Sequence, residues 1–234
     1  MSRKPRHLIC IDLDGPILDV SERYYRIYLD AFTPLAAEPL SKETYWELKR
    51  NKVSEPEVLA QSGIRKPELV RAYLNERSGR IEAAEYLAFD QVWPGTHDTL
   101  RALRSRAHLA LVTMRTSKAL LHQQLDRLNL IQSFDCILTA GPGAVANERG
   151  EQKAQLVRDC YQNEATVGWF VGDTETDIQS GRLLGLRTAA ITFGIRTVEH
   201  LNSASPDLML HSPAELQSWA GNFDWPAPAE ESFT

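Results

Sequence analysis

The hydrophobic pattern divides the chain into a first apolar strand, a long helical stretch and a series of alternating strands and helices. The apolar run 7–11 leads into Asp12 and Asp14, and a glycine and a proline then stop any strand. Because a strand alternates its faces, we expect Asp12 and Asp14 to point the same way and Leu13 to point into the core. Such a carboxylate pair needs a positive partner, normally a metal ion, or else lies in a solvated acidic turn.

Residues 20–90 carry helical patterns and no strand-like alternation. Serine caps, a proline near a helix start and apolar residues at helical spacing favour a compact block of helices between the first strand and the next. We expect five helices, which begin at or near Ser21, Ser41, Ser54, Pro67 and Arg80.

From residue 93 onward strands alternate with helices. This order predicts an α/β fold with a Rossmann-like, doubly wound parallel sheet and helices on both faces. Ligands of such sheets bind beyond the carboxyl ends of the strands. The expected strands are 108–112, 134–138, 167–171, 187–191 and 207–210, and the expected helices are 96–106, 118–128, 152–161, 176–184 and one capped by Ser212.

Composition and charge narrow the class of protein. The 234 residues are 43% hydrophobic and 24% charged, as in ordinary soluble domains, and the net charge of -5 offers no basic surplus for nucleic acid. Three cysteines, Cys10, Cys136 and Cys160, make a disulfide framework unexpected and fit a reducing compartment. The apolar run after the basic first residues is too short for a signal peptide or a membrane span. We therefore expect a cytoplasmic protein with no nucleic-acid or membrane partner.

Polar side chains that could take part in catalysis or in ligand binding follow the predicted strands at their carboxyl ends. The first strand delivers two acids, the second ends in a hydroxyl, and a later one ends in an acid that a second acid follows one helical turn on. A lysine opens the helix before that later strand. In chain order these residues are Asp12, Asp14, Thr113, Lys153, Asp173 and Asp177.

This ordered set resembles the four motifs of the haloacid dehalogenase-like (HAD) hydrolases, and the resemblance extends from residue 8 to about 220. The helical block resembles the cap of the subgroup that includes phosphoglycolate phosphatase, β-phosphoglucomutase and the haloacid dehalogenases. The resemblance implies a Rossmann-like core at 1–19 and 91–225 with an inserted all-helical cap at 20–90. The remaining tail, 226–234, has a composition typical of disorder.

The resemblance also implies a role for each acid of the first motif. Asp12 would be the nucleophile that forms a phosphoaspartyl intermediate. Asp14 would protonate the leaving alkoxide and then activate water, and we expect the charge of Asp12 to raise the pKa of Asp14 for that task.

Metal and phosphate binding are implied in the same way. Mg²⁺ would be held by Asp12, the Asp14 main-chain carbonyl and Asp173, and Asp177 would orient Lys153 or a metal-bound water. The phosphoryl group would meet Asp12, the Thr113 hydroxyl, the Met114 main-chain amide and the Lys153 ammonium.

Each of these assignments has an alternative that the sequence leaves open. Thr113 can cap the turn that follows it, Lys153 can be a solvated lysine, since the proline that often follows the motif lysine is absent, and Asp177 can favour the helix dipole. Arg115 either supplies a second cation or points outward. The basic loop 49–52 either reaches a substrate anion or is a solvated helix end.

The reaction that fits best is hydrolysis of a small phosphorylated metabolite. Asp14 argues against a dehalogenase and against phosphonate cleavage. A phosphomutase of the same family, or a HAD-fold protein that binds a metabolite without turnover, remains the alternative. We expect the cap aromatics to be core residues rather than a nucleobase sandwich. The sequence encodes neither the natural substrate nor the oligomeric state.

Overall fold

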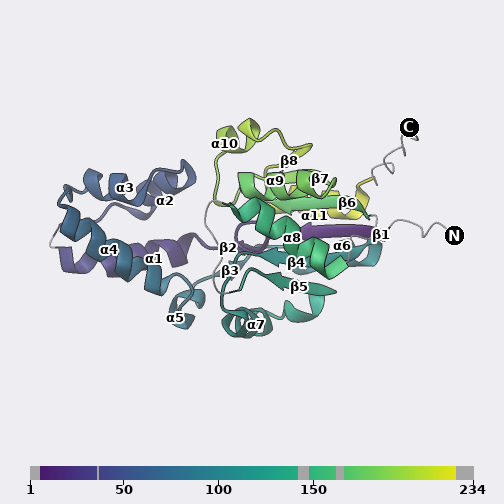
Figure 1. The fold of residues 1–234 in the computed structure, drawn as a ribbon, viewed down its shortest axis with the longest axis horizontal. Coiled ribbons are helices and arrows are strands. Elements are labelled where there is room, and N and C mark those ends of the chain that lie inside the picture. The colour runs from purple at the N-terminus through teal and green to yellow at the C-terminus, as the bar shows by residue number, and fades with distance from the viewer. Residues whose placement is uncertain (1–5, 36, 142–147, 162–165, 225–234) are drawn as a thin grey trace.

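A parallel sheet with β1 near its centre organises the molecule (Figure 1). In this computed structural model, which describes residues 6–35, 37–141, 148–161 and 166–224, the sheet has six strands in the order β5-β4-β1-β6-β7-β8. Every neighbouring pair is parallel, so the predicted α/β class is confirmed. The strands are β1 (Arg6–Ile11), β4 (His108–Thr113), β5 (Cys136–Thr139), β6 (Thr166–Gly172), β7 (Arg187–Ile191) and β8 (Leu208–Leu210).

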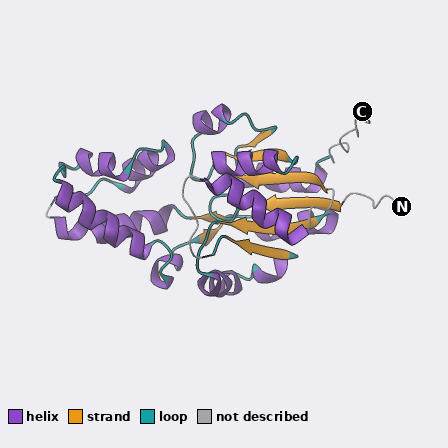
Figure 2. Cartoon of the chain, viewed as in Figure 1, coloured by secondary structure: helices purple, strands orange, loops and turns teal. Residues whose placement is uncertain are grey.

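Helices cover both faces of this sheet (Figure 2). The side chains of β1 alternate, so that Ile9 and Ile11 enter the larger apolar cluster and Leu8 and Cys10 enter the other. Figure 2 shows the sheet between these two helical layers. Residues of α6 (Thr96–Arg106), α7 (Lys118–Arg127) and α11 (Pro213–Asn222) belong to the larger cluster, residues of α8 (Arg149–Tyr161) to the other, and α8 packs against α9 (Glu175–Leu183).

A helical segment, residues 21–87, lies beyond the carboxyl end of β1 (Figure 1). A two-stranded antiparallel ribbon of β2 (Leu18–Asp19) and β3 (Gln91–Val92) joins it to the sheet. Its own core contains Tyr28 and Tyr45, whose rings stack with centroids 4.5 Å apart. These buried aromatics are core residues, as predicted. The segment contains α1 (Ser21–Phe32), α2 (Lys42–Arg50), α3 (Glu55–Gln61), α4 (Pro67–Arg80) and α5 (Ala84–Leu87).

Local signals place most helix starts correctly. The hydroxyls of Ser41, Ser54 and Ser212 accept the predicted capping hydrogen bonds, and Ser54 forms a full capping box. The N-cap position of α6 is Gly95, which has a φ of 79°, a conformation that glycine adopts readily.

The other differences concern two short helices and the start of one longer helix. The predicted helix 80–89 is limited to α5, α8 begins three residues before the predicted residue 152, and α10 (Val198–Ser203) follows β7 unpredicted. Tertiary contacts stabilise these short pieces, so the local pattern does not reveal them.

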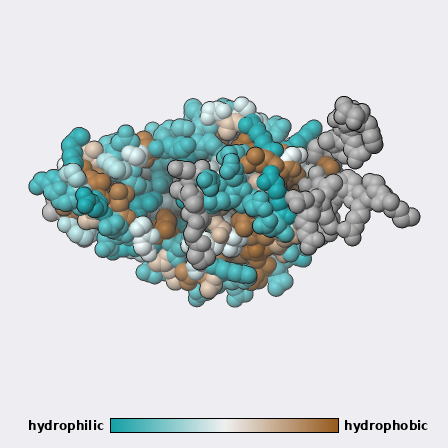
Figure 3. All heavy atoms as spheres, in the orientation of Figure 1, coloured by the Kyte–Doolittle hydropathy of each residue, from teal (hydrophilic) through white to brown (hydrophobic). Residues whose placement is uncertain are grey.

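The surface and the cysteines add two observations. The visible face is mostly hydrophilic (Figure 3), and no helix within the described ranges has the length and apolar character of a membrane span. Cys10 is buried, and the Sγ atoms of Cys136 and Cys160 lie 2.9 Å apart as free thiols. The tail 226–234 lies outside the described residues.

Candidate active site

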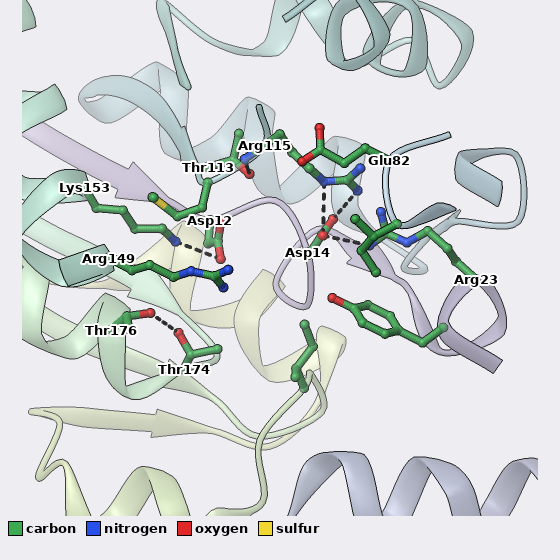
Figure 4. Close-up of a pocket in the computed structure, with 14 residues that line it drawn as sticks. Asp12, Asp14, Arg23, Glu82, Thr113, Arg115, Arg149, Lys153, Thr174 and Thr176 are labelled. Carbon is green, nitrogen blue, oxygen red and sulfur yellow. Dashed lines mark hydrogen bonds and ion pairs between the residues drawn. The ribbon is translucent and has the colours of Figure 1, made fainter. Parts of the chain in front are cut away.

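A cavity of about 180 Å³ opens at the carboxyl ends of the strands. Its lining brings together predicted residues from distant parts of the chain: Asp12, Asp14, Thr113, Met114 and Lys153. The first two follow β1, the next two end or follow β4, and the lysine lies on α8. Figure 4 shows Asp12 and Lys153 on one side of the cavity and Asp14 on the other.

Lys153 lies between two acids, not in solvent. Its side chain is 2% exposed, and Nζ lies 2.9 Å from Asp12 Oδ2 and 2.5 Å from Asp177 Oδ1. Burial alone would lower the pKa of Lys153, but the two carboxylates outweigh it and raise this pKa. The ammonium is therefore charged, and it faces the predicted nucleophile.

Asp177 is fully engaged by the chain itself. Its Oδ2 accepts from the main-chain amides of Asp173 and Thr174 and from the Thr174 hydroxyl, while Oδ1 contacts Lys153. Thr174 and Asp177 form a capping box at the start of α9. Asp177 thus anchors the helix start and orients Lys153 at the same time.

Among the described residues, three buried acids lie close together around a single buried cation, Lys153. Ligand oxygens of Asp12, Asp173 and Asp177 all lie within 4.8 Å of one another. Burial, followed by the charges of neighbouring carboxylates, raises the pKa of Asp12 and of Asp173 although Lys153 opposes it. Such a set of oxygens suits a hard divalent cation.

A carboxylate oxygen of Asp173 that has no hydrogen-bond partner among the described residues also indicates a metal site. Asp173 is fully buried, and its Oδ2 accepts from the Ile195 amide at 2.5 Å, whereas Oδ1 has no hydrogen-bond partner among the described residues. A buried carboxylate oxygen without a partner is costly, and a cation would satisfy it. The donor set therefore fits a metal ion.

Gly15 keeps this part of the site open. It has a φ of +107°, and a Cβ built on it would collide with the Asp173 carboxylate. Only glycine combines that backbone conformation with the close approach of Asp173.

The Asp14 side chain does not point the same way as Asp12, and its pKa is not raised, so the structure differs from the sequence prediction in both respects. Asp12 faces Lys153, whereas Asp14 accepts from Arg115, at 2.7 Å to Oδ1 and 3.2 Å to Oδ2, and from Arg23 at 2.7 Å to Oδ2. The strand ends at Ile11, so its alternation no longer sets these directions.

The predicted rise in the pKa of Asp14 is therefore wrong. Burial would raise this pKa, but Arg115 and Arg23 outweigh burial and hold it well below its usual range. The Asp14 side chain is also outside the acidic cluster, which leaves its main-chain carbonyl as the group that could meet a metal.

Asp90 completes this charged network. It is 2% exposed and lies just before β3, with Oδ1 3.1 Å from Arg23 Nε and Oδ2 3.4 Å from Arg115 Nη2. Gln124 donates to Oδ2 at 2.6 Å. The network connects the loop after β1, the start of α1 and the chain entering β3.

The sequence prediction missed Arg23, Asp90 and Arg149 and left Arg115 undecided. Arg115 is 6% exposed and points inward as a second cation. Arg149 lines the cavity one helical turn before Lys153, a spacing on one helix face that could have revealed it had the helix start been placed earlier.

The hydroxyl of Thr113 remains able to donate into the cavity. Its Oγ1 accepts from the Arg115 amide at 3.4 Å, which uses an acceptor position and leaves the O–H group. Met114 also lines the cavity.

The basic loop 49–52 docks on the sheet side of the molecule, outside the cavity lining. Arg50 Nη2 donates to the carbonyls of Thr192, at 2.5 Å, and of Arg196, at 3.1 Å. Lys52 pairs with Glu175 at 2.9 Å. The loop therefore makes a contact between α2 and the loop after β7, and Asn51 and Lys52 at its end are exposed.

Comparison with known proteins identifies the family. The family model described as haloacid dehalogenase-like hydrolase matches residues 7–185. The chain therefore belongs to the haloacid dehalogenase-like hydrolases, and the predicted family and the prediction of an enzyme are confirmed.

Two relatives align over nearly the whole chain. A phosphoglycolate phosphatase of Synechococcus elongatus is 25% identical, with 89% of this chain and 94% of the relative covered. A pyrophosphatase PpaX of Halalkalibacterium halodurans is 22% identical, with 91% and 96% covered. Phosphatases are thus among the similar proteins.

Solved structures show the same fold. A haloacid dehalogenase-like family hydrolase of Streptococcus pneumoniae superposes with a TM-score of 0.71 at 21% identity, over 92% of this chain and 98% of that one. A HAD-superfamily hydrolase, subfamily IA, of Geobacter sulfurreducens gives 0.66 at 18% identity, over 92% and 97%.

Proposed function

We propose that the protein is a Mg²⁺-dependent phosphomonoester hydrolase that acts on a small phosphorylated metabolite through a phosphoaspartyl intermediate on Asp12. The observation that carries this proposal is the position of Asp12, which lines the cavity and lies 2.9 Å from a buried lysine and within a cluster of buried acids. The names of the two relatives that align over nearly the whole chain, both phosphatases, support it.

In the first step an oxygen of Asp12 attacks phosphorus, and the bond from phosphorus to the ester oxygen breaks. The Leu13 amide donates to Asp12 Oδ1 at 2.8 Å and Lys153 contacts Oδ2, so the carboxylate is fixed before attack. Lys153 and the Thr113 hydroxyl would offset charge on the phosphoryl oxygens.

Asp12, Asp173 and the main-chain carbonyl of Asp14 would hold Mg²⁺. When bound, the ion supplies positive charge that reduces repulsion between the carboxylate nucleophile and the phosphate. Asp177 would act through Lys153, which its Oδ1 contacts, while its Oδ2 accepts from the main-chain amides of Asp173 and Thr174.

Asp14 would give a proton to the leaving alkoxide and later take one from the water that cleaves the phosphoaspartyl bond. Both of its oxygens accept N–H groups from Arg115 or Arg23. Oδ2 accepts two of these N–H groups and Oδ1 accepts one, so among the described residues Oδ1 is the oxygen that keeps a position for a proton.

We also infer that residues 20–90 act as a cap over a core formed by 1–19 and 91–225. Ile81, Glu82, Arg23 and Tyr24 of this region line the cavity together with core residues. Glu82 accepts from the amides of Thr116 and Ser117, beside the motif that ends β4. A cap that closes the cavity would favour small substrates and limit access of water.

The experiment that tests the function is phosphate release from a panel of small phosphomonoesters with and without Mg²⁺. We expect release by the wild-type protein, and none by Asp12→Asn or after chelation by EDTA. Transfer of phosphate to a second position of the substrate, without release, would indicate a mutase. Absence of both reactions in a folded protein would contradict the proposed hydrolysis of a phosphomonoester.

A further inference from the structure

The catalytic pocket contains a cation that the proposed mechanism does not use. Arg149 is the first residue of α8 and lines the cavity with Asp12 and Lys153. Residues four apart on a helix share a face, so Arg149 and Lys153 present their charges to the same side of the cavity. Figure 4 shows the Arg149 guanidinium beside Asp12.

The other cations of the pocket have carboxylate partners. Arg23 and Arg115 pair with Asp14 and Asp90, and Lys153 pairs with two acids. Within the part of the chain that the structure describes, no ion pair or hydrogen bond of the Arg149 side chain is present. Arg149 is thus the pocket cation for which these residues supply no anion.

The backbone at Arg149 is fixed by the packing of α8 on α9. The buried Ser180 hydroxyl donates to the carbonyl of Gly150 at 2.9 Å. A Cβ on Gly150 would collide with the side chain of Gln179. The fold therefore sets where the Arg149 side chain starts, and its long stem carries the guanidinium to the cavity.

We propose, building on the proposed phosphatase function, that Arg149 is a specificity-determining residue that binds a second anionic group of the substrate, a carboxylate or a further phosphate. A guanidinium donates two parallel N–H bonds to either group. The cavity of about 180 Å³ is smaller than the pockets of drug-sized ligands, which begin near about 300 Å³. The substrate class is therefore a small phosphomonoester that carries its second charge close to the ester.

The test compares three esters that differ only in the far group: 2-hydroxyethyl phosphate, 2-phosphoglycolate and ethane-1,2-diyl bisphosphate. In Arg149→Gln we expect kcat/KM to fall about 10- to 100-fold on a charged ester, the loss of one charge-assisted contact. We expect it to change less than about threefold on 2-hydroxyethyl phosphate. The charged ester that loses more identifies the anion as carboxylate or phosphate.

Two variants serve as controls. Arg149→Lys keeps the charge but not the paired donors, so we expect a smaller loss on the charged esters. Arg101→Gln removes an arginine that is 77% exposed on α6 and should leave all three rates unchanged. Thermal unfolding of each variant shows whether the fold is intact.

An equal loss on all three esters would overturn the proposal, because it would place Arg149 on the transferring phosphoryl group. Unchanged kinetics on all three would also overturn it. A calorimetric measurement separates it from the proposed function: Asp12→Asn with and without Arg149→Gln is titrated with 2-phosphoglycolate and with ethane-1,2-diyl bisphosphate. Weaker binding of either ligand on removal of Arg149 supports the anion site even if wild-type protein hydrolyses none of the esters, and equal binding of both contradicts it.

Discussion

The guanidinium of Arg115 meets both oxygens of Asp14, with Nη2 2.7 Å from Oδ1 and Nε 3.2 Å from Oδ2. The two residues lie 101 positions apart, after neighbouring parallel strands. Paired contacts of this kind fix orientation as well as charge. The acid that the proposed mechanism needs for proton transfer is therefore held by a side chain of the adjacent loop.

Arg115→Met tests this positioning. The variant removes both contacts to Asp14 and leaves Asp90 with less compensating charge, so we expect kcat to fall about 10- to 100-fold. Steady-state kinetics on the preferred ester give the value. Arg115→Lys should lose less, because it keeps a positive charge near Asp14. Equal kcat values for Arg115→Met and wild type would contradict a positioning role.

Mg²⁺ is expected to stabilise the fold through Asp173. At a free concentration about 100 times its dissociation constant, a ligand adds about 2.7 kcal/mol to the free energy of unfolding, or about 5 to 10 °C in melting temperature. In Asp173→Asn this gain should disappear, because the negative charge is lost and an amide oxygen that still accepts from Ile195 leaves an NH2 group, which cannot bind a cation, at the position of the unpartnered Oδ1. Asp98→Asn, at a side chain that is 60% exposed on α6, is the matched control. A full Mg²⁺ shift in Asp173→Asn would place the ion elsewhere.

Arg50 connects the helical segment to the loop that contacts Asp173, and we expect this connection to affect substrate binding. It donates to the carbonyls of Thr192 and Arg196, and Ile195 of the same loop donates to Asp173. Arg50→Ala should therefore raise KM roughly 3- to 10-fold, as expected for the loss of ordinary hydrogen bonds.

The comparison variant is Lys42→Ala at the other end of α2, where Lys42 pairs with Glu22 inside the helical segment. Its KM should match that of wild type. Identical KM values for Arg50→Ala and Lys42→Ala would show that the contact of α2 with this loop has no part in substrate binding.

Glu55 is expected to control acid stability of the helical segment. Oε1 lies 3.1 Å from Lys49 Nζ and from Arg77 Nε, and Tyr73 donates to Oε2 at 3.0 Å. Burial alone would raise the pKa of Glu55, but Lys49 and Arg77 outweigh it and lower the pKa from its ordinary 4.5.

The sign of the pH dependence follows from that lowered pKa. The unfolded chain binds the proton first, so this stabilisation is complete above about pH 4.5 and is lost as pH falls through the folded pKa. Glu55→Gln should cost about 3 kcal/mol at pH 7, since it leaves buried cations unpaired. Its denaturation midpoints should depend less on pH below about 4.5, and an unchanged acid dependence would contradict the assignment.

Periodicity and caps in the sequence determined the order of the main strands and helices. The strand 187–191 was predicted with the bounds that the structure gives, and the serine caps at 41, 54 and 212 are present. These signals are local: they depend on residues within one helical turn or one strand, so they survive without knowledge of the fold. The motif residues Asp12 and Thr113 were found because the ends of parallel strands meet at one edge, and Lys153 was found by its place in the chain order of the family motifs.

Only the tertiary structure decided which charges face one another. The pairing of Asp14 with Arg23 and Arg115 depends on two loops and the start of α1, and burial multiplies the effect of each neighbouring charge. The spacing of apolar and polar residues along the sequence does not show such contacts. The shift in the pKa of Asp14 was therefore predicted in the wrong direction. Sequence thus determined which groups reach the site, and packing decided their partners, because partners far apart along the chain are set by the fold as a whole.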